Sequence, residues 1–251
     1  MIEVTSTIYE SEELRVVTGP AIRPGGVELT ARAVEFCAFP AGARLLDVGC
    51  GEGATVKHLR DRYQLDASGV DISSRLLADG KERDETLPIV RAQAEHLPYE
   101  SGALDGILCE CVLSLLPEPE KALLEFHRVL APAGHLILSD IYVRGVAGHE
   151  HLPEGAADGC LKGALPIDST ATMLEETGFT ILIREDHTRY LRELAARLIL
   201  ANGSLDGVCA GMKFDGHSIG RPGYYLMVAR KLEVTPPSLP LIQGEEHDSP
   251  S

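Results

Sequence analysis

Short, largely apolar runs alternate with amphipathic stretches through the first half of the chain. The runs at 44–48 and 104–109 are typical of strands buried on both faces of a sheet, whereas 55–63 and 118–130 repeat apolar residues at helical spacing. Such alternation favours βαβ units with right-handed crossovers, which build a parallel sheet between two layers of helices. The pattern therefore predicts an α/β fold. The other elements expected in this half are helices over 27–39 and 74–81 and strands over 67–70, 88–91 and 135–139.

The second half repeats the alternation with fewer elements. We expect a helix over 169–177, a strand over 179–184, a helix over 190–201 and a final strand over 224–231. The two last strands are expected to pair in antiparallel fashion at one edge of the sheet. The tail over 235–251 is rich in Pro, Ser and acidic residues, a composition that predicts disorder.

Composition and charge narrow the class of protein. The chain has 251 residues and a mass of 27.0 kDa, with 44% hydrophobic residues, 24% charged residues and a mean hydropathy of +0.01. These values suit one large globular domain. Lys and Arg total 23 against 38 Asp and Glu, which gives a formal net charge of −15. Because such a surface repels a polyanion, nucleic acid is not expected as a partner.

Two further features bear on location. No stretch reaches the roughly 18 uninterrupted apolar residues that a membrane span needs, and the segment 1–13 is polar and acidic, unlike a secretory signal. The six cysteines lie mostly within apolar runs, which fits a reducing compartment better than a disulfide framework. We therefore expect a cytoplasmic protein without a membrane partner.

The most informative local motif joins the first strand to its helix. Leu45 to Gly53 reads as a buried strand that runs into three alternating glycines, which let a ligand lie against the backbone. The dinucleotide fingerprint would place the last glycine one residue later. Twenty residues after Gly51, Asp71 stands at the end of the second strand, where a carboxylate accepts hydrogen bonds from both hydroxyls of a ribose. Together with Asp47, this acid predicts a nucleoside ligand.

The successive motifs resemble those of the class I S-adenosylmethionine-dependent methyltransferases, in particular the type 11 domains. The glycine loop, Asp71, Glu95-His96-Leu97-Pro98, Leu104-Asp105 and the segment 128–136 keep that family's order and spacing. The resemblance implies S-adenosylmethionine as cofactor and a Rossmann-like three-layer sandwich. Its seven-stranded, mostly parallel sheet would have an antiparallel last strand. We expect an amino-terminal lid or helical segment (1–41), a methyltransferase domain (42–234) and a disordered tail (235–251).

The same resemblance assigns roles to residues. Asp47 and the loop glycines would lie along the methionine part of the cofactor, Asp71 would hold the ribose and Ile72 would pack on the adenine. Many family members meet the adenine amino group with an Asp, whereas this chain has Gln93, whose carbonyl oxygen can accept the same hydrogen bond. The full set of expected cofactor contacts is Asp47, Gly49, Cys50, Gly51, Gly53, Asp71, Ile72, Gln93, Ala94, Glu95 and Cys109.

Methyl transfer from a sulfonium is an in-line displacement, so the protein mainly aligns two reactants and excludes water. The acceptor should approach the end of the strand over 104–109. Glu110 is the expected catalytic residue there, because its carboxylate can meet either the cofactor's ammonium or an acceptor proton. The acidic balance favours a small-molecule acceptor, and no oligomeric state is predicted. The residues expected on the acceptor side are Tyr9, Arg23, Cys111, Cys160 and Cys209.

Two alternative functions stay open. The segments 109–115 and 159–165 are similar to segments of the arsenite methyltransferases, in which a cysteine at the position of Cys160 binds a trivalent metalloid. Cys209 lies where a partner thiolate is expected, although that family's amino-terminal cysteine pair is absent. The second alternative is a non-catalytic sensor or partner subunit that binds S-adenosylmethionine. No Cys-x2-Cys spacing occurs, so no resident metal is expected.

Overall fold

The strands form one twisted sheet in the computed structural model, which describes residues 21, 23–144, 163–202 and 221–232. The strand order in this part of the chain is β3-β2-β1-β4-β5-β7-β6. The strands are β1 (Arg44–Val48), β2 (Asp66–Asp71), β3 (Ile89–Arg91), β4 (Leu104–Glu110), β5 (Leu130–Arg144), β6 (Phe179–Asp186) and β7 (Arg221–Lys231). Strands β1 to β5 pair in parallel, and β7 is antiparallel to both β5 and β6. The predicted seven-stranded α/β sandwich with an antiparallel last strand is confirmed.

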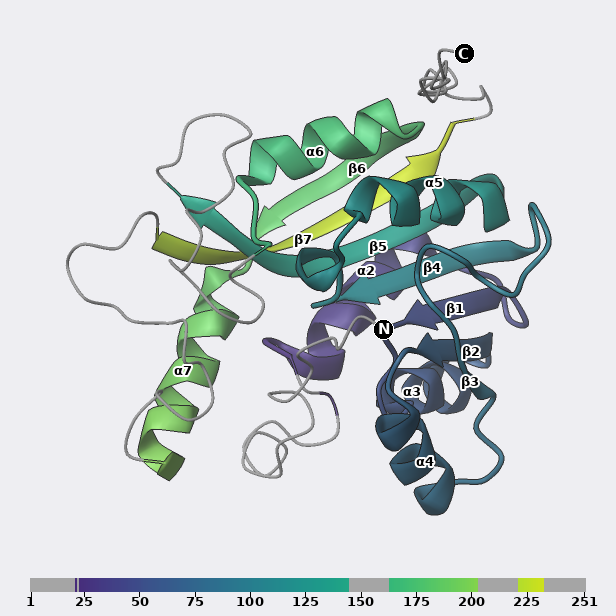
Figure 1. Ribbon diagram of the computed structural model, residues 1–251, viewed down its shortest axis with the longest axis horizontal. Coiled ribbons are helices and arrows are strands. Elements are labelled where there is room, and N and C mark those ends of the chain that lie inside the picture. The colour runs from purple at the N-terminus through teal and green to yellow at the C-terminus, as the bar shows by residue number, and fades with distance from the viewer. Residues whose placement is uncertain (1–20, 22, 145–162, 203–220, 233–251) are drawn as a thin grey trace, which may run out of the picture.

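Helices cover both faces of the sheet (Figure 1). The α2 face carries α2 (Gly26–Cys37), α3 (Ala54–Tyr63), α4 (Ser74–Arg83) and α7 (Thr188–Asn202), and the α5 face carries α5 (Pro119–Val129) and α6 (Ile167–Glu176). Each face has its own apolar core, because successive strand residues point to opposite sides. Leu45 of β1 packs in the core of the α2 face, whereas Leu46 packs in that of the α5 face.

Element boundaries follow the apolar pattern closely, with one clear difference at β5. The strand expected over 135–139 is the middle of a strand that begins at Leu130 and ends at Arg144. Its pairing with β4 shifts register between Leu104 and Gly106, and its second half is held by an antiparallel ladder with β7. Local patterning misses this extension because the partner strand lies about 90 residues further along the chain.

The sheet brings the predicted acids to one edge. Asp47 lies near the carboxyl end of β1, and Asp71 and Glu110 end β2 and β4, the two strands that flank β1. The chain reverses its direction of winding between β1 and β4. Ligands of open α/β sheets bind outside the carboxyl ends of the strands at such a switch point. The fold therefore places the predicted residues where a ligand is expected.

Candidate functional site

The glycine loop turns sharply between β1 and α3. The backbone N–H groups of Gly49 and Cys50 donate to the Val70 carbonyl at 2.8 and 3.0 Å, which holds the loop against the end of β2. Gly49 has a φ of 75°, and a Cβ there would lie 2.2 Å from Val112 Cγ2. Both the backbone conformation and the space therefore require glycine at this position.

Asp71 ties this loop to the end of β2. Its Oδ2 accepts the N–H of Gly51 at 2.8 Å, and its Oδ1 accepts the N–H of Ser73 at 2.8 Å. Because a carboxylate offers about four acceptor positions, ligand hydroxyls can share this group with the loop. Asp71 is thus held in place by backbone donors before any ligand arrives.

The other residues predicted to meet a nucleoside lie at the ends of β2 and β3. Ile72 follows Asp71 directly and is 37% exposed, so it offers an apolar surface beside the carboxylate. Gln93 is exposed, and its backbone forms an isolated bridge with His96 just beyond β3. Ala94 is buried and Glu95 is half-buried. The structure thus brings these residues to the same edge as Asp71, because β2 and β3 are adjacent.

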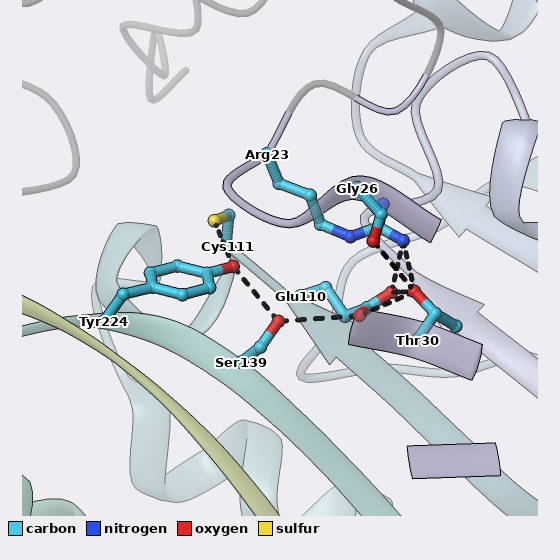
Figure 2. Close-up of polar contacts among 7 residues, drawn as sticks. All are labelled: Arg23, Gly26, Thr30, Glu110, Cys111, Ser139 and Tyr224. Atoms are coloured by element: carbon cyan, nitrogen blue, oxygen red, sulfur yellow. Dashed lines mark hydrogen bonds and ion pairs between the residues drawn. The ribbon is translucent and has the colours of Figure 1, made fainter. Parts of the chain in front are cut away.

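A buried group of charged side chains occupies the ends of β1 and β4 on the α2 face. Arg23, in the turn before α2, forms an ion pair with Glu110 at 2.8 Å between Nη2 and Oε2. Thr30 of α2 donates its hydroxyl to the two Glu110 oxygens at 3.0 and 3.1 Å and accepts from Arg23 Nη2 at 2.6 Å (Figure 2). Both Glu110 oxygens therefore already accept hydrogen bonds.

Asp47 adds a second carboxylate to this group without a matching donor. It is 4% exposed, and no donor in the described part of the chain hydrogen-bonds to it. Burial raises the pKa of Asp47 to about 8, and the Glu110 carboxylate adds to that rise while Arg23 opposes it. The buried Nε of Arg23 likewise has no partner among the described residues. The Asp47 carboxylate and the Arg23 Nε could therefore bind a ligand that carries both a positive and a negative group.

The predicted cysteines divide between the faces of the sheet. Cys109 is fully buried in the core of the α5 face, away from Asp47 and Glu110, so its predicted cofactor contact is possible only through its backbone. Cys111 packs on the α2 face, because its φ of 58° turns it out of the alternation of β4. Cys50 lies against Gly69, where a Cβ would come within 2.7 Å of its Sγ. Burial raises the pKa of the Cys50 and Cys109 thiols, so both stay protonated.

The predicted acceptor residues are only partly placed. Arg23 lies in the buried charged group rather than at an open surface, and Cys111 contacts Tyr224. Tyr9, Cys160 and Cys209 lie outside the described residues, so their roles stay predictions. Nowhere in the described ranges does a group of three or more His, Cys, Asp or Glu suit a metal ion. The same residues contain no helix long and apolar enough to cross a membrane.

Sequence reasoning missed three polar residues of this region, which are Thr30, Ser139 and Tyr224. Each is fully buried and joins the hydrogen bonds around Glu110 or Cys111. The sequence indicates their role only weakly, because each is a polar or amphipathic residue among apolar neighbours in a predicted helix or strand. Only the sheet register reveals that they meet.

Comparison with known proteins finds methyltransferases. A family model described as a methyltransferase domain matches residues 46–138. The methyltransferase GfsG of Streptomyces halstedii is 26% identical over 82% of this chain and 80% of its own length. The arsenite methyltransferase of Halobacterium salinarum is 24% identical over 63% of this chain but only 43% of its own length, so the chain spans less than half of it.

A solved structure shares the fold. Phosphoethanolamine N-methyltransferase 2 of Haemonchus contortus, in complex with phosphomonomethylethanolamine and S-adenosylhomocysteine, superposes with a TM-score of 0.72 at 22% identity. The match covers 91% of this chain and 58% of that one. The domain match over residues 46–138 and the methyltransferase relatives show that the chain is a class I S-adenosylmethionine-dependent methyltransferase, and the shared fold agrees with them.

Proposed function

We propose that the protein transfers a methyl group from S-adenosylmethionine to a small molecule, with the cofactor lying across the ends of β2, β1 and β4. One observation carries the placement: the edge offers two chemically different halves. Asp71 and the loop backbone suit a ribose, whereas Asp47 and the Arg23 Nε suit an α-ammonium and an α-carboxylate. Those are the two ends of S-adenosylmethionine.

In the nucleoside half, Asp71 would accept both ribose hydroxyls and Ile72 would pack on the adenine. The Gln93 carbonyl would accept the adenine amino group. The backbone from Gly49 to Gly53 would lie along the chain that joins the sugar to the amino acid. The remaining contacts proposed for the cofactor come from Cys50, Gly51, Ala94, Glu95 and the Cys109 backbone.

In the amino-acid half, Glu110 would act electrostatically rather than as a base. Its two oxygens already accept from Arg23 and Thr30, so these contacts hold the carboxylate in place beside the position of the ammonium. When bound, the cofactor supplies a methyl group on a positively charged sulfur. Around it, the chain's own residues orient the reactants and exclude water, which suits an in-line displacement.

A small-molecule acceptor follows best from the charge. The formal net charge of −15 weighs against a polyanionic acceptor such as RNA. The test is to incubate the protein with methyl-labelled S-adenosylmethionine and three fractions of a cell extract, namely small metabolites, RNA and protein. Label should enter the metabolite fraction. Label confined to RNA or protein would refute the small-molecule acceptor, and binding without any transfer would favour the sensor alternative.

One observation keeps a metalloid acceptor as a second candidate. The arsenite methyltransferase of Halobacterium salinarum is among the relatives, and the sequence has cysteines at 160 and 209, which lie outside the described residues. The same assay should therefore include arsenite with a thiol reductant. If arsenite is the acceptor, Cys160→Ser should abolish labelling of arsenic while cofactor binding stays intact. If it is not, wild type transfers no label to arsenic.

A further inference from the structure

A second buried polar group links the far strands of the sheet to Glu110. Tyr224 of β7 and Ser139 of β5 are both fully buried. The Tyr224 hydroxyl lies 3.1 Å from Ser139 Oγ and 3.1 Å from Cys111 Sγ, and Ser139 Oγ lies 3.5 Å from Glu110 Oε1. Figure 2 shows these side chains in a row that ends at the Arg23 ion pair. Three strands thus contribute to one hydrogen-bonded chain.

The sheet register builds this chain. Ser139 lies directly opposite Glu110 in the β4–β5 ladder, and Tyr224 lies opposite Ile141 in the β5–β7 ladder. Residues 139 and 141 point to the same face, so the Tyr224 ring reaches Ser139 along the diagonal of the antiparallel pair. A phenylalanine would fill the same space, so the apolar core alone does not account for the hydroxyl.

The donors in the chain have one consistent direction. Glu110 is a carboxylate paired with Arg23, so it accepts, and Ser139 must donate to it. Ser139 then accepts from Tyr224, whose pKa burial holds well above its ordinary value, so the phenol keeps its proton. Tyr224 in turn accepts from the Cys111 thiol. Each donated proton in this chain therefore points toward Glu110. Successive hydrogen bonds in such a chain strengthen one another in a buried environment.

The same hydroxyl supports the turn that follows β4. Cys111 has a φ of 58°, a conformation that L-residues other than glycine adopt at a cost. Its N–H donates to the Ser139 carbonyl at 2.7 Å, and its Sγ lies 3.1 Å from the Tyr224 hydroxyl, so both contacts help to hold this turn. Tyr224 thus contacts both the carboxylate chain and the turn on which the acceptor would approach.

We propose that Tyr224 is a positioning residue of the methyltransferase. Through Ser139 it holds the Glu110 carboxylate, and through Cys111 it holds the turn after β4, in the arrangement that receives the amino-acid end of the cofactor. This inference rests on the proposed placement of that end beside Glu110 and Asp47. It assigns a role at the site to a residue at the opposite end of the sequence from the glycine loop.

The test compares Tyr224→Phe with Tyr225→Phe. Tyr225 is the next residue and is also buried, but it packs in the core of the α5 face, on the side of the sheet away from Glu110. Calorimetric titration uses S-adenosylhomocysteine, which has the amino-acid end, and 5′-methylthioadenosine, which lacks it. Loss of one such hydrogen bond should weaken S-adenosylhomocysteine binding by roughly three- to ten-fold for Tyr224→Phe and leave methylthioadenosine unchanged. Tyr225→Phe should change neither affinity.

Ser139→Ala removes the next hydroxyl in the same hydrogen-bonded chain, and it tests the proposal if Tyr224→Phe fails to fold. It should reproduce the selective loss. Because both hydroxyls act on Glu110 along one path, the losses of the Tyr224→Phe/Ser139→Ala double variant should be smaller than the sum of the two single losses. Equal losses for both ligands would indicate a merely structural role. A Tyr224→Phe protein that binds both ligands as wild type does would likewise overturn the proposal.

Glu110→Gln separates this inference from the function on which it rests. If Glu110→Gln leaves the ratio of the two affinities unchanged, the amino-acid end does not lie beside Glu110 and the proposed placement is wrong. If Glu110→Gln lowers that ratio and the Tyr224 and Ser139 variants do not, the placement holds and only the positioning role is refuted.

Discussion

The two halves of the proposed cofactor site are built in different ways. In the nucleoside half, one carboxylate, Asp71, is held by the backbone N–H groups of Gly51 and Ser73, which lie close to it in the sequence. In the amino-acid half, Arg23, Asp47 and Glu110 come from distant parts of the chain and meet only because β1, β4 and α2 are packed together. The first half is a local motif, and the second is a product of the tertiary fold.

The difference extends to charge. Asp71 has neutral donors on both oxygens, so the nucleoside half is ordered without a ligand. Asp47 and Glu110 share one buried guanidinium, and within the described residues Asp47 lacks a donor. A buried charge without a partner is costly. The amino-acid half should therefore be the part that a ligand completes, and the part whose behaviour depends on pH.

The largest effect is expected when the nucleoside half loses its carboxylate. Asp71→Ala removes the ribose acceptor and leaves the N–H groups of Gly51 and Ser73 without their carboxylate partner. The loss of hydrogen bonds to a charged group should cost about 2–3 kcal/mol, which is a factor of about 100 in affinity for both S-adenosylhomocysteine and 5′-methylthioadenosine. Isothermal calorimetry measures both. Asp66→Ala, at the exposed start of the same strand, is the control that should bind normally.

Substitution in the other half should affect one ligand only. Asp47→Asn keeps the shape but removes the charge that would meet the α-ammonium, so S-adenosylhomocysteine binding should fall by roughly 10- to 30-fold at about pH 9, with little change for methylthioadenosine. The ratio of the two affinities is the measurement. An equal loss for both ligands would show that the two halves do not act separately.

The raised pKa of Asp47 predicts a pH dependence. With a pKa of about 8, Asp47 is largely neutral at pH 7 in the empty protein, and an incoming ammonium favours its ionised form. S-adenosylhomocysteine affinity should therefore increase up to about tenfold per pH unit as pH rises toward about 8, and level off above it. The charged groups that act on the Asp47 carboxylate are Glu110, Arg23 and Asp71. Arg23 stays charged over this whole pH range.

The control for this pH dependence is Asp47→Asn, whose affinity should lack the rise. Calorimetry in buffers of different ionisation enthalpy should also show proton release on binding to wild type. The sign for stability is opposite: the folded state of the empty protein binds the Asp47 proton more tightly than the unfolded state does. Asp47 should therefore lower stability progressively as pH rises from about 4 to about 8. A flat affinity profile for wild type would contradict the assignment.

The same contrast explains what the sequence could and could not predict. The strand and helix periods, the turn glycines and the sequence distance from Gly51 to Asp71 are local, so they predict the fold and the contact between Gly51 and Asp71. The amino-acid half depends on pairings such as Glu110 with Thr30, 80 residues apart. The local pattern of apolar and polar residues cannot predict a pairing between residues so far apart in the sequence.

Arg23 and Cys111 show where local reasoning stops. Both are expected on the acceptor side, and that role stays a prediction. The sequence does not predict their contacts: Arg23 pairs with Glu110, and Cys111 adopts a left-handed conformation that places its thiol against Tyr224. An arginine in a Pro-Gly turn, such as Arg23, is expected to be exposed unless a buried carboxylate is known to lie beside it. The register of β5 with β4 and β7 supplies this information, and that register is not visible in the strands themselves.

The smallest expected effect lies at the adenine. Gln93 is exposed, so water competes for its hydrogen bond, and Gln93→Ala should weaken S-adenosylhomocysteine binding by only about two- to five-fold. Its amide carries both a donor and an acceptor, so it can also turn to meet the carbonyl of S-inosylhomocysteine. Wild type should therefore discriminate weakly between these two ligands. Gln93→Glu, which can only accept, should increase the preference for adenine, and an unchanged preference would mean that Gln93 does not contact the base.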